Sequence, residues 1–378
     1  MFIMRKIKNL VCFLIRIFIS EFPAKRKKHY DIIIVRVDLI GDFIMRYDSL
    51  IELKKQIVGK KVMLICSESV KPFITDDVFF ADIISYKIKE VSNNLKYFFR
   101  FSKLLKKYSA DIIYYQAWER YIEGDIIISC LKGNEIIGMN GIDVRGLSQR
   151  YYDRKYTKLI NFPNDKHELL QIEHFVRSTF NPNYVYGKNS FVLKKKDYPN
   201  IIGPYVVISI SSSMEEKMWP IDRFAKLIDY IPDFLLVVIT GVGNKDYIRA
   251  QQILQLVKNK RKVINYVGKT SVMDLAHLIS QSKFVIGNDS SAVHIAAATR
   301  VPSICLLHGA HYGRFFPYPD SIMEKKYLPR IVHKPMKCYN CNYKCIFSNT
   351  KPFKCLDGIS VDMALCVLNE LLLELHFL

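Results

Sequence analysis

Short apolar runs alternate along most of the chain with longer segments in which apolar residues recur every three or four positions. The short runs predict buried strands, and the longer periodic segments predict amphipathic helices. A regular alternation of the two is typical of parallel sheets that carry helices on both faces. In the first half, the predicted strands are Asp31–Asp38, Lys61–Cys66, Asp82–Tyr86, Asp111–Gln116 and Glu135–Met139, and the predicted helices include Phe43–Gln56 and Asn94–Tyr108.

The second half repeats this pattern after a polar, irregular stretch at residues 140–165, which predicts a loop, and a predicted helix at His167–Phe180. Proline and asparagine are frequent between Asn181 and Pro204, as expected of an interdomain linker. The further predicted strands are Tyr205–Ile210, Phe234–Thr240, Val263–Val267, Lys283–Gly287 and Ser303–Leu307, and the further predicted helices are Ile221–Tyr230, Lys245–Lys258, Ser271–Gln281 and Ser291–Thr299.

The pattern and the length of 378 residues together predict two domains. We expect an α/β protein of two doubly wound domains that face each other across a central cleft, with ligands at the carboxyl ends of the strands. The expected parts are an N-terminal segment 1–30, a first domain 31–185 and a second domain 200–378. The second domain also carries a cysteine-rich insertion at 337–356 and a closing helix at Val361–Phe377.

Basic residues are in clear excess, with 56 Lys and Arg against 36 Asp and Glu and a formal net charge of +20. This excess excludes an acidic protein and favours anionic partners such as phosphates, a membrane surface or nucleic acid. Apolar residues make up 50% of the chain, which excludes wholesale disorder. The chain has no complete dinucleotide-binding fingerprint, Walker loop or G-x-S-x-G elbow, so the motifs do not favour an NAD enzyme or a P-loop NTPase.

Residues 1–30 combine apolar and basic character. On a helical wheel Arg5, Asn9 and Arg16 share one side, which predicts an amphipathic helix at a membrane interface; a helix packed on the protein itself is the alternative. The basic run 25–28 would favour an anionic inner leaflet. Because Arg16 interrupts a short apolar stretch, we expect neither a signal peptide nor a membrane span, but a cytoplasmic protein bound peripherally to that leaflet.

Gly41 and Asp42 follow the first predicted strand in the segment Asp38-Leu-Ile-Gly-Asp. Glycine allows a tight strand-to-helix turn and the close approach of a ligand to the backbone. A carboxylate at that place can accept a proton from an attacking hydroxyl, which makes Asp42 a candidate general base. Capping of the following helix is the alternative role for this residue.

Polar turns follow strands of the second half as well. The segment from Ser211 to Lys217 offers hydroxyl donors and a cation to a diphosphate, although an ordinary polar loop has the same composition. After another strand, the first N–H groups of an alanine-rich helix, those of Ser290, Ser291 and Ala292, would point at an anion. Asp289 would hold sugar hydroxyls or cap that helix.

Gly241 and Gly243 follow a further strand of the second half. Two glycines at a strand end can admit a nucleobase or a ribose, although Gly-x-Gly alone is not a specific signal.

Four of the nine cysteines gather in one insertion with the spacing Cys338-x2-Cys341-x3-Cys345-x9-Cys355. Four thiolates can form a structural zinc site, although these gaps match no standard zinc ribbon. A disulfide pair or a reduced, packed cluster is the alternative, and disulfides are not expected in a cytosolic protein.

With these segments in this order, the sequence resembles the glycosyltransferase family 9 enzymes, the ADP-heptose:lipopolysaccharide heptosyltransferases and their relatives. The resemblance covers most of Asp31–Pro317 and rests on IIIVRVDLIGDF, KMWPIDRFAKLI and VGKTSVMDLAHLISQSKFVIGNDSSAVHIAAATRVPSICLLHG. It implies a GT-B fold of two Rossmann-like domains. It also implies inverting transfer of a sugar from a nucleotide-diphosphate donor such as ADP-heptose to lipopolysaccharide or a related glycan, with no required metal or other cofactor.

Matched residue by residue, the resemblance implies that Asp42 is the general base and that Lys217 neutralises the diphosphate. The other implied donor contacts are Ser212, Ser213, Asp289, Ser290 and Ser291. Ser291 stands where the family usually has glycine, and residues 209–212 replace an Asn-Pro-Gly type of turn. Another nucleotide sugar, used for a surface polysaccharide, is therefore the alternative donor.

Two other functions are weighed against transfer. An epimerase, phosphorylase or hydrolase on the same scaffold would need a second acid–base group or a nucleophile near Asp42, and none stands out in the sequence. A non-catalytic basic protein that binds nucleic acid would gather its cations with aromatic residues. Here the cations are scattered apart from the N-terminal run and Lys194–Lys196, so we do not expect a nucleic-acid partner.

Overall fold

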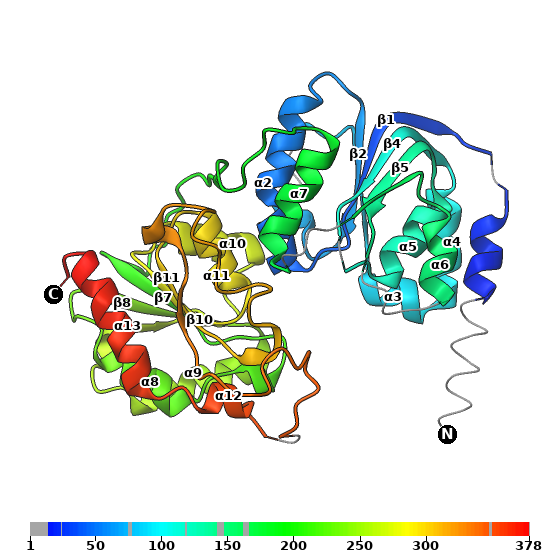
Figure 1. Ribbon diagram of the computed structural model, residues 1–378. Coiled ribbons are helices and arrows are strands. Elements are labelled where there is room, and N and C mark those ends of the chain that lie inside the picture. Colours follow the sequence, from blue (N-terminus) through cyan, green and yellow to red (C-terminus); the bar gives the residue numbers. More distant parts are fainter. Residues whose placement is uncertain are drawn as a thin grey trace. The chain divides into compact units, whose positions relative to one another are not determined.

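A computed structural model of the chain describes residues 14–377 except 24, 75–77, 118, 142–146, 162–165 and 348–349 (Figure 1). The chain divides into two compact units, of which the first comprises Met1–Phe43, Ser49–Asp165 and Gln171–Tyr184, and the second comprises Ile44–Asp48, Lys166–Leu170 and Val185–Leu378. Each unit holds one six-stranded sheet with helices on both faces (Figure 1). The predicted class, α/β with two doubly wound domains, is confirmed.

The first unit has a parallel sheet in the order β3-β2-β1-β4-β5-β6. Its strands are β1 (Lys28–Val35), β2 (Val62–Ser67), β3 (Asp82–Tyr86), β4 (Tyr108–Tyr115), β5 (Lys132–Met139) and β6 (Lys158–Ile160). The helices in this part of the chain are α2 (Ile40–Gln56), α3 (Ile88–Asn93), α4 (Leu95–Leu105), α5 (Ile122–Cys130), α6 (Leu147–Asp153) and α7 (Glu168–Thr179). The prediction of a plain loop at 140–165 is wrong, because α6 and β6 lie within this stretch.

The second unit has a parallel sheet in the order β12-β11-β10-β7-β8-β9. Its strands are β7 (Tyr205–Ser209), β8 (Leu236–Thr240), β9 (Val263–Asn265), β10 (Val285–Asn288), β11 (Ser303–Leu306) and β12 (Arg330–Val332). Its helices are α8 (Ile221–Asp229), α9 (Gly243–Leu256), α10 (Val272–Ser280), α11 (Ser291–Ala298), α12 (Lys354–Asp357) and α13 (Val361–Glu374).

The two strand orders fix where each sheet can bind a ligand. In the first sheet the chain winds outward in both directions from the neighbours β1 and β4, and in the second from β7 and β10. Connections on either side of such a pair lie on opposite faces, so a crevice opens at the carboxyl ends of the two strands. The loops that follow these strands are therefore the places to look for chemistry.

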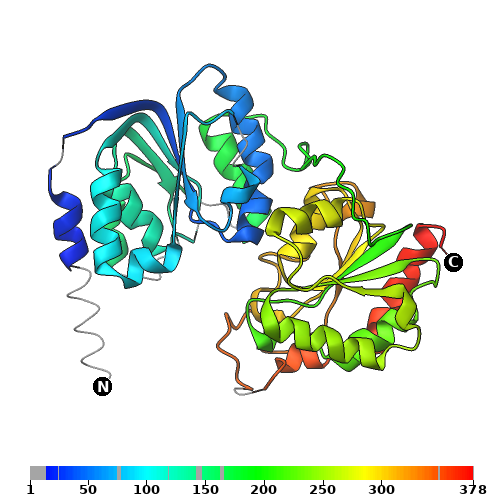
Figure 2. The same cartoon turned by 180° about the vertical axis from the view of Figure 1, so that it is seen from behind.

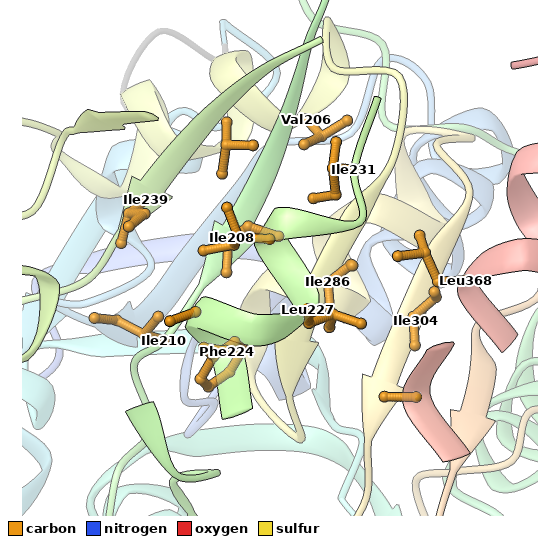
Figure 3. Packing of buried hydrophobic residues seen from close by; sticks show 14 of the residues in the cluster. Val206, Ile208, Ile210, Phe224, Leu227, Ile231, Ile239, Ile286, Ile304 and Leu368 are labelled. Carbon is orange, nitrogen blue, oxygen red and sulfur yellow. The ribbon is translucent and has the colours of Figure 1, made fainter. Parts of the chain in front are cut away.

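The sheet of the second unit lies over a core of apolar side chains that are almost wholly removed from water. Figure 3 shows Val206 of β7 near Ile231, which follows α8, and Ile208 of β7 between Ile231 and Phe224 in the view; Leu368 of α13 belongs to the same cluster. These strands are apolar on both faces, as strands covered by helices on both sides require. The predicted closing helix is thus part of the core of this unit.

We expect Leu368→Ala to lower the free energy of unfolding by about 2–5 kcal/mol, because it removes buried methyl groups and leaves a cavity. Leu373→Ala on the same helix is the matched control, since Leu373 is 59% exposed and Leu368 is 0% exposed. Urea unfolding followed by circular dichroism measures both. Equal losses in the two variants would contradict the packing of α13 described above.

Within the part of the chain that the structure describes, no helix is both long and apolar enough to cross a membrane. Residues 14–21 are helical, whereas Arg5 and Asn9 of the predicted amphipathic helix lie outside the described residues.

Candidate active site

The loops after β7 and β10 are tied together by one buried amide. Asn288, the last residue of β10, accepts a hydrogen bond from the backbone N–H of Trp219 (2.9 Å) and donates one to the carbonyl oxygen of Ile210 (3.0 Å). Trp219 is itself fully buried, and its indole N–H donates to the carbonyl of Ile359 (3.0 Å). Both ends of the loop that carries Lys217 are thereby fixed to the strand that leads to Asp289.

Lys217 and Asp289 are brought together at this crevice. Lys217 ends the 3-10 turn Glu215–Lys217, and its ammonium nitrogen lies 3.9 Å from a carboxylate oxygen of Asp289. The same oxygen lies 3.0 Å from Nε2 of His308, which follows β11. All three residues are buried. A carboxylate between a lysine and a histidine can orient both groups toward a ligand.

The contacts of His308 define the position of its proton. Its Nδ1 accepts a hydrogen bond from the backbone N–H of Ala310 (3.1 Å), so the proton of the neutral ring lies on Nε2, the atom that faces Asp289. Burial alone would raise the pKa of Asp289, but the His308 ring and the Lys217 ammonium hold it well below its usual range. At neutral pH the Asp289 carboxylate is therefore charged and accepts hydrogen bonds.

The start of α11 offers polar groups to an anion. Ser290 occupies the N-cap position, yet its side chain makes no capping hydrogen bond, so the first N–H groups of α11, at Ser291 and Ala292, have no side-chain cap. The hydroxyls of Ser290 and Ser212 are buried and, among the described residues, have no hydrogen-bond partner. Buried hydroxyls without partners are costly, and a phosphate oxygen would satisfy them. Ser213 is exposed in the same loop.

His294 on α11 is a buried, neutral histidine beside this site. Its ring stacks on Phe316 with the centroids 4.5 Å apart, and its Nδ1 lies 2.7 Å from the hydroxyl of Tyr318. Burial lowers the pKa of His294 to about 4.

This lowered pKa predicts a pH-dependent stability. Histidine in an unfolded chain titrates near pH 6.5, so below that pH protons bind the unfolded chain more strongly than the native one. The stabilisation from a neutral His294 is complete above about pH 6.5 and falls by about 3 kcal/mol on the way to pH 4. We expect His294→Gln to remove that part of the pH dependence of urea unfolding, whereas His376→Gln, at an exposed histidine, should keep it. Identical pH slopes in wild type and His294→Gln would contradict the prediction.

Gly241 and Gly243 shape the turn between β8 and α9. Gly243 has a φ of +76°, and the buried carboxylate of Asp246 accepts a hydrogen bond from the N–H of Val242 (2.8 Å). A Cβ on Gly241 would approach Asp246 to 2.9 Å. The turn itself thus explains both glycines, and contact with a nucleobase there stays a prediction.

The four cysteines of the insertion line one cavity, together with Gly309, Ala310, Tyr339, Phe347 and Phe353. All four are free thiols, and the Sγ of Cys355 accepts a hydrogen bond from the N–H of Gly309 (3.3 Å). Their chemistry suits zinc, but no three or more histidine, cysteine or acidic residues in the described ranges are arranged to hold a metal ion. Zinc binding by these four cysteines therefore stays a prediction.

The insertion also contributes an aromatic ring to the site. The Tyr343 ring centroid lies 5.7 Å from the ammonium of Lys217 and 5.6 Å from the centroid of His308. An aromatic face beside a buried ammonium is a favourable arrangement. Tyr343 also helps to enclose the space around the lysine.

Asp42 belongs to the first unit, at the crevice of the other sheet. It lies in the first turn of α2, directly after β1, and is half-buried. Leu39, not Asp42, occupies the N-cap position of this helix. Across the same crevice, the buried guanidinium of Arg36 donates to the side-chain oxygen of Gln116, which follows β4 (2.8 Å). Asp42 thus lies at the start of the helix that follows β1, and its role as a general base stays a prediction.

Sequence reasoning missed three residues of this site, namely Asn288, His308 and Tyr343. Asn288 and His308 lie within the long motif of the second half, whose local pattern assigns them no role, and Tyr343 lies in the cysteine-rich insertion. One feature of the sequence indicates His308: it follows a predicted strand, as Asp289 does. That feature points to the site only once the strand order is known, because the strand order places β11 beside β10.

A doubly wound unit with a buried lysine, a carboxylate and an uncapped helix start at its crevice is typical of α/β proteins that bind phosphate groups. The sequence matches Glycosyltransferase family 9 (heptosyltransferase) over residues 99–346, which is more than half of the chain. The chain therefore belongs to glycosyltransferase family 9.

Curated relatives are similar at low identity. The chain is 21% identical over 296 residues to lipopolysaccharide heptosyltransferase 3 of Escherichia coli, covering 75% of this chain and 85% of the relative. It is 30% identical over 122 residues to lipopolysaccharide heptosyltransferase 3 of E. coli strain K12, where the match spans 32% of this chain and only 35% of the relative.

Solved structures have the same fold. A glycosyltransferase family 9 protein of Veillonella parvula has a TM-score of 0.70 at 17% identity, covering 93% of this chain and 100% of that one. E. coli heptosyltransferase WaaC, solved with ADP-2-deoxy-2-fluoro heptose, has a TM-score of 0.63 at 16% identity, covering 91% and 99%. At these identities the likeness shows the fold, and it confirms the GT-B type predicted from the sequence.

Proposed function

We propose that this protein is an inverting glycosyltransferase that moves a heptosyl group from ADP-heptose to lipopolysaccharide or a related glycan. The observation that carries the proposal is the buried group of Lys217, Asp289 and His308 beside the uncapped start of α11. Family membership and the similarity to lipopolysaccharide heptosyltransferases support the reaction class.

In this proposal the second unit binds the donor diphosphate. Lys217 supplies a cation, and the N–H groups at Ser290, Ser291 and Ala292 supply hydrogen-bond donors for the charge that builds on the leaving phosphate. The hydroxyl of Ser212 supplies a further donor, and Asp289 accepts hydrogen bonds from the sugar hydroxyls. These groups are fixed before the reaction, so little reorganisation is needed when the bond to the phosphate breaks.

Asp42 is the proposed general base. It takes the proton of the acceptor hydroxyl, whose oxygen attacks the anomeric carbon from the side opposite the diphosphate and inverts the configuration. The electron pair of the broken bond leaves with the nucleoside diphosphate, which Lys217 and the start of α11 stabilise.

The experiment is a transfer assay with the full chain, a panel of nucleotide sugars and lipopolysaccharide truncated in its inner core. We expect mass spectrometry to detect one added heptose only with ADP-heptose, and NMR to show an inverted anomeric configuration. Addition of a different sugar would assign another donor. That outcome would agree with Ser291 standing where the family usually has glycine. No transfer from any donor would contradict the reaction class.

We propose that transfer requires no cofactor. Zinc at Cys338, Cys341, Cys345 and Cys355 stays a prediction, and no step depends on it. Metal analysis of the purified protein tests it, and the transfer assay in a metal chelator tests the independence of catalysis from any metal.

The proposed acceptor is a glycolipid, so the proposed place of action is the cytoplasmic side of the membrane that carries it. The positive net charge favours that location, because the inner leaflet is anionic.

A further inference from the structure

The helical residues 14–21 are held on the first unit by basic side chains. The buried Arg16 guanidinium donates to the carbonyl oxygen of Ser92 and lies 5.9 Å from the ring centroid of Phe98 on α4. The ammonium of Lys106, just after α4, donates to the carbonyl oxygens of Ile19 and Phe22. Arg16 thus faces the protein, and the opposite side of the helix faces outward.

That outward side is apolar. Leu14 is 54% exposed, Phe18 65% and Phe22 57%, and the rings of Phe18 and Phe22 pack edge to face with centroids 5.1 Å apart. Glu21, the one carboxylate in residues 14–28, is instead bound to Lys155 and to Tyr151. A group of exposed aromatic and aliphatic side chains without a carboxylate among them is typical of an interaction surface.

Helix α4, on which Arg16 packs, carries positive charge on its exposed face. Its inner face buries Phe98 and Phe101, while Lys96, Phe99, Arg100 and Lys103 are exposed at positions i, i+3, i+4 and i+7, which share one face of a helix. No aspartate or glutamate occurs between Glu90 and Asp111. The helix therefore presents an aromatic side chain among three cations.

The two parts are neighbours. The N–H groups of Lys27 and Lys28 donate to the carbonyl oxygen of Lys107 (2.7 and 3.1 Å), and the Arg26 guanidinium donates to the carbonyl of Lys106 (2.7 Å). Residues 26–28 therefore lie beside the end of α4, and the two views of the ribbon agree that the N-terminal helix lies beside this helix (Figures 1 and 2). Lys25 and Lys27 are exposed at this junction.

We propose that this basic–aromatic face docks the first unit on an anionic lipid bilayer. We define it as Leu14, Phe18, Phe22, Lys25, Lys27, Lys96, Phe99, Arg100 and Lys103. The apolar side chains enter the boundary between headgroups and acyl chains, and the cations bind the anionic headgroups. A second copy of the chain fits this face poorly, because it would bring like charges together. This inference is independent of the reaction proposed above.

The test is co-sedimentation of the full chain with vesicles of phosphatidylcholine alone or with added phosphatidylglycerol. We expect at least tenfold stronger partition onto the anionic vesicles, reduced by salt. Two face variants should each lower that partition about tenfold or more. One is the double variant Phe18→Ser/Phe22→Ser, and the other is the triple variant Lys96→Gln/Arg100→Gln/Lys103→Gln. Two matched controls change exposed residues outside this face. One is Ile202→Ser, at an apolar residue that is 87% exposed, and the other is Lys194→Gln/Lys195→Gln/Lys260→Gln, at exposed lysines.

Equal binding to both kinds of vesicle, or wild-type binding by either face variant, would overturn the proposal. So would a concentration-dependent dimer in light scattering that the face variants abolish, since this face would then join two copies. Transfer to a delipidated, water-soluble acceptor should be unchanged in the face variants, which separates failure of docking from failure of catalysis.

Discussion

Asp42→Asn is expected to lower the rate of sugar transfer by about 10²–10⁴-fold, because an amide cannot take the proton of the acceptor hydroxyl. The variant should still bind the nucleoside diphosphate, since the groups assigned to the diphosphate belong to the second unit. Single-turnover transfer measures the rate, and isothermal titration calorimetry with ADP measures the binding.

The control is Asp111→Asn, which removes a half-exposed carboxylate of β4 from the same unit. It should transfer at the wild-type rate. If Asp42→Asn retains that rate as well, the base must be another group, and the role taken from the family resemblance is lost.

Lys217→Met is expected to lower kcat/KM by about 100-fold or more, equivalent to about 3 kcal/mol. Two effects act together. The leaving diphosphate loses its cation, and the buried carboxylate of Asp289 loses the ammonium group beside it. ADP binding should weaken along with catalysis, because the lysine acts on the charge of the diphosphate before and after the reaction.

Lys245→Met is the matched control, because Lys245 is highly exposed and pairs with Glu215 of the same 3-10 turn. An exposed pair of this kind contributes little, so this variant should stay close to wild type in binding and transfer. Far-UV circular dichroism at the assay temperature shows whether Lys217→Met is folded. A folded Lys217→Met protein with normal kcat/KM would exclude this residue from the donor site.

The central strands could be predicted from the sequence because they are buried on both faces and form continuous apolar runs. Two of the four edge strands, β6 and β12, could not, whereas the edge strands β3 and β9 were predicted. β6 and β12 have three residues each, too few to show a period, and α6 lies in a polar stretch that reads as a loop. The two short strands form because the strands β5 and β11 beside them offer free N–H and carbonyl groups, which the local pattern of a three-residue segment does not contain.

The residues of the candidate site also divide into those that the sequence indicates and those that only the fold brings to the site. Lys217 and Asp289 could be proposed because each follows a strand in a recognisable motif. The contribution of His308 depends on β11 lying next to β10, and that of Tyr343 on the course of the insertion back toward Lys217. These are long-range consequences of topology, which local patterns do not contain.

The pairing of Lys217 with Asp289 also bears on how quickly the enzyme can turn over. In the protein alone the ammonium already has a carboxylate neighbour, so it does not pay the full desolvation penalty of a buried cation. In the proposed reaction, the nucleoside diphosphate that remains after transfer competes with that carboxylate for the same positive charge. In that reaction the competition weakens the binding of the nucleoside diphosphate product and favours its release, so that another donor molecule can bind.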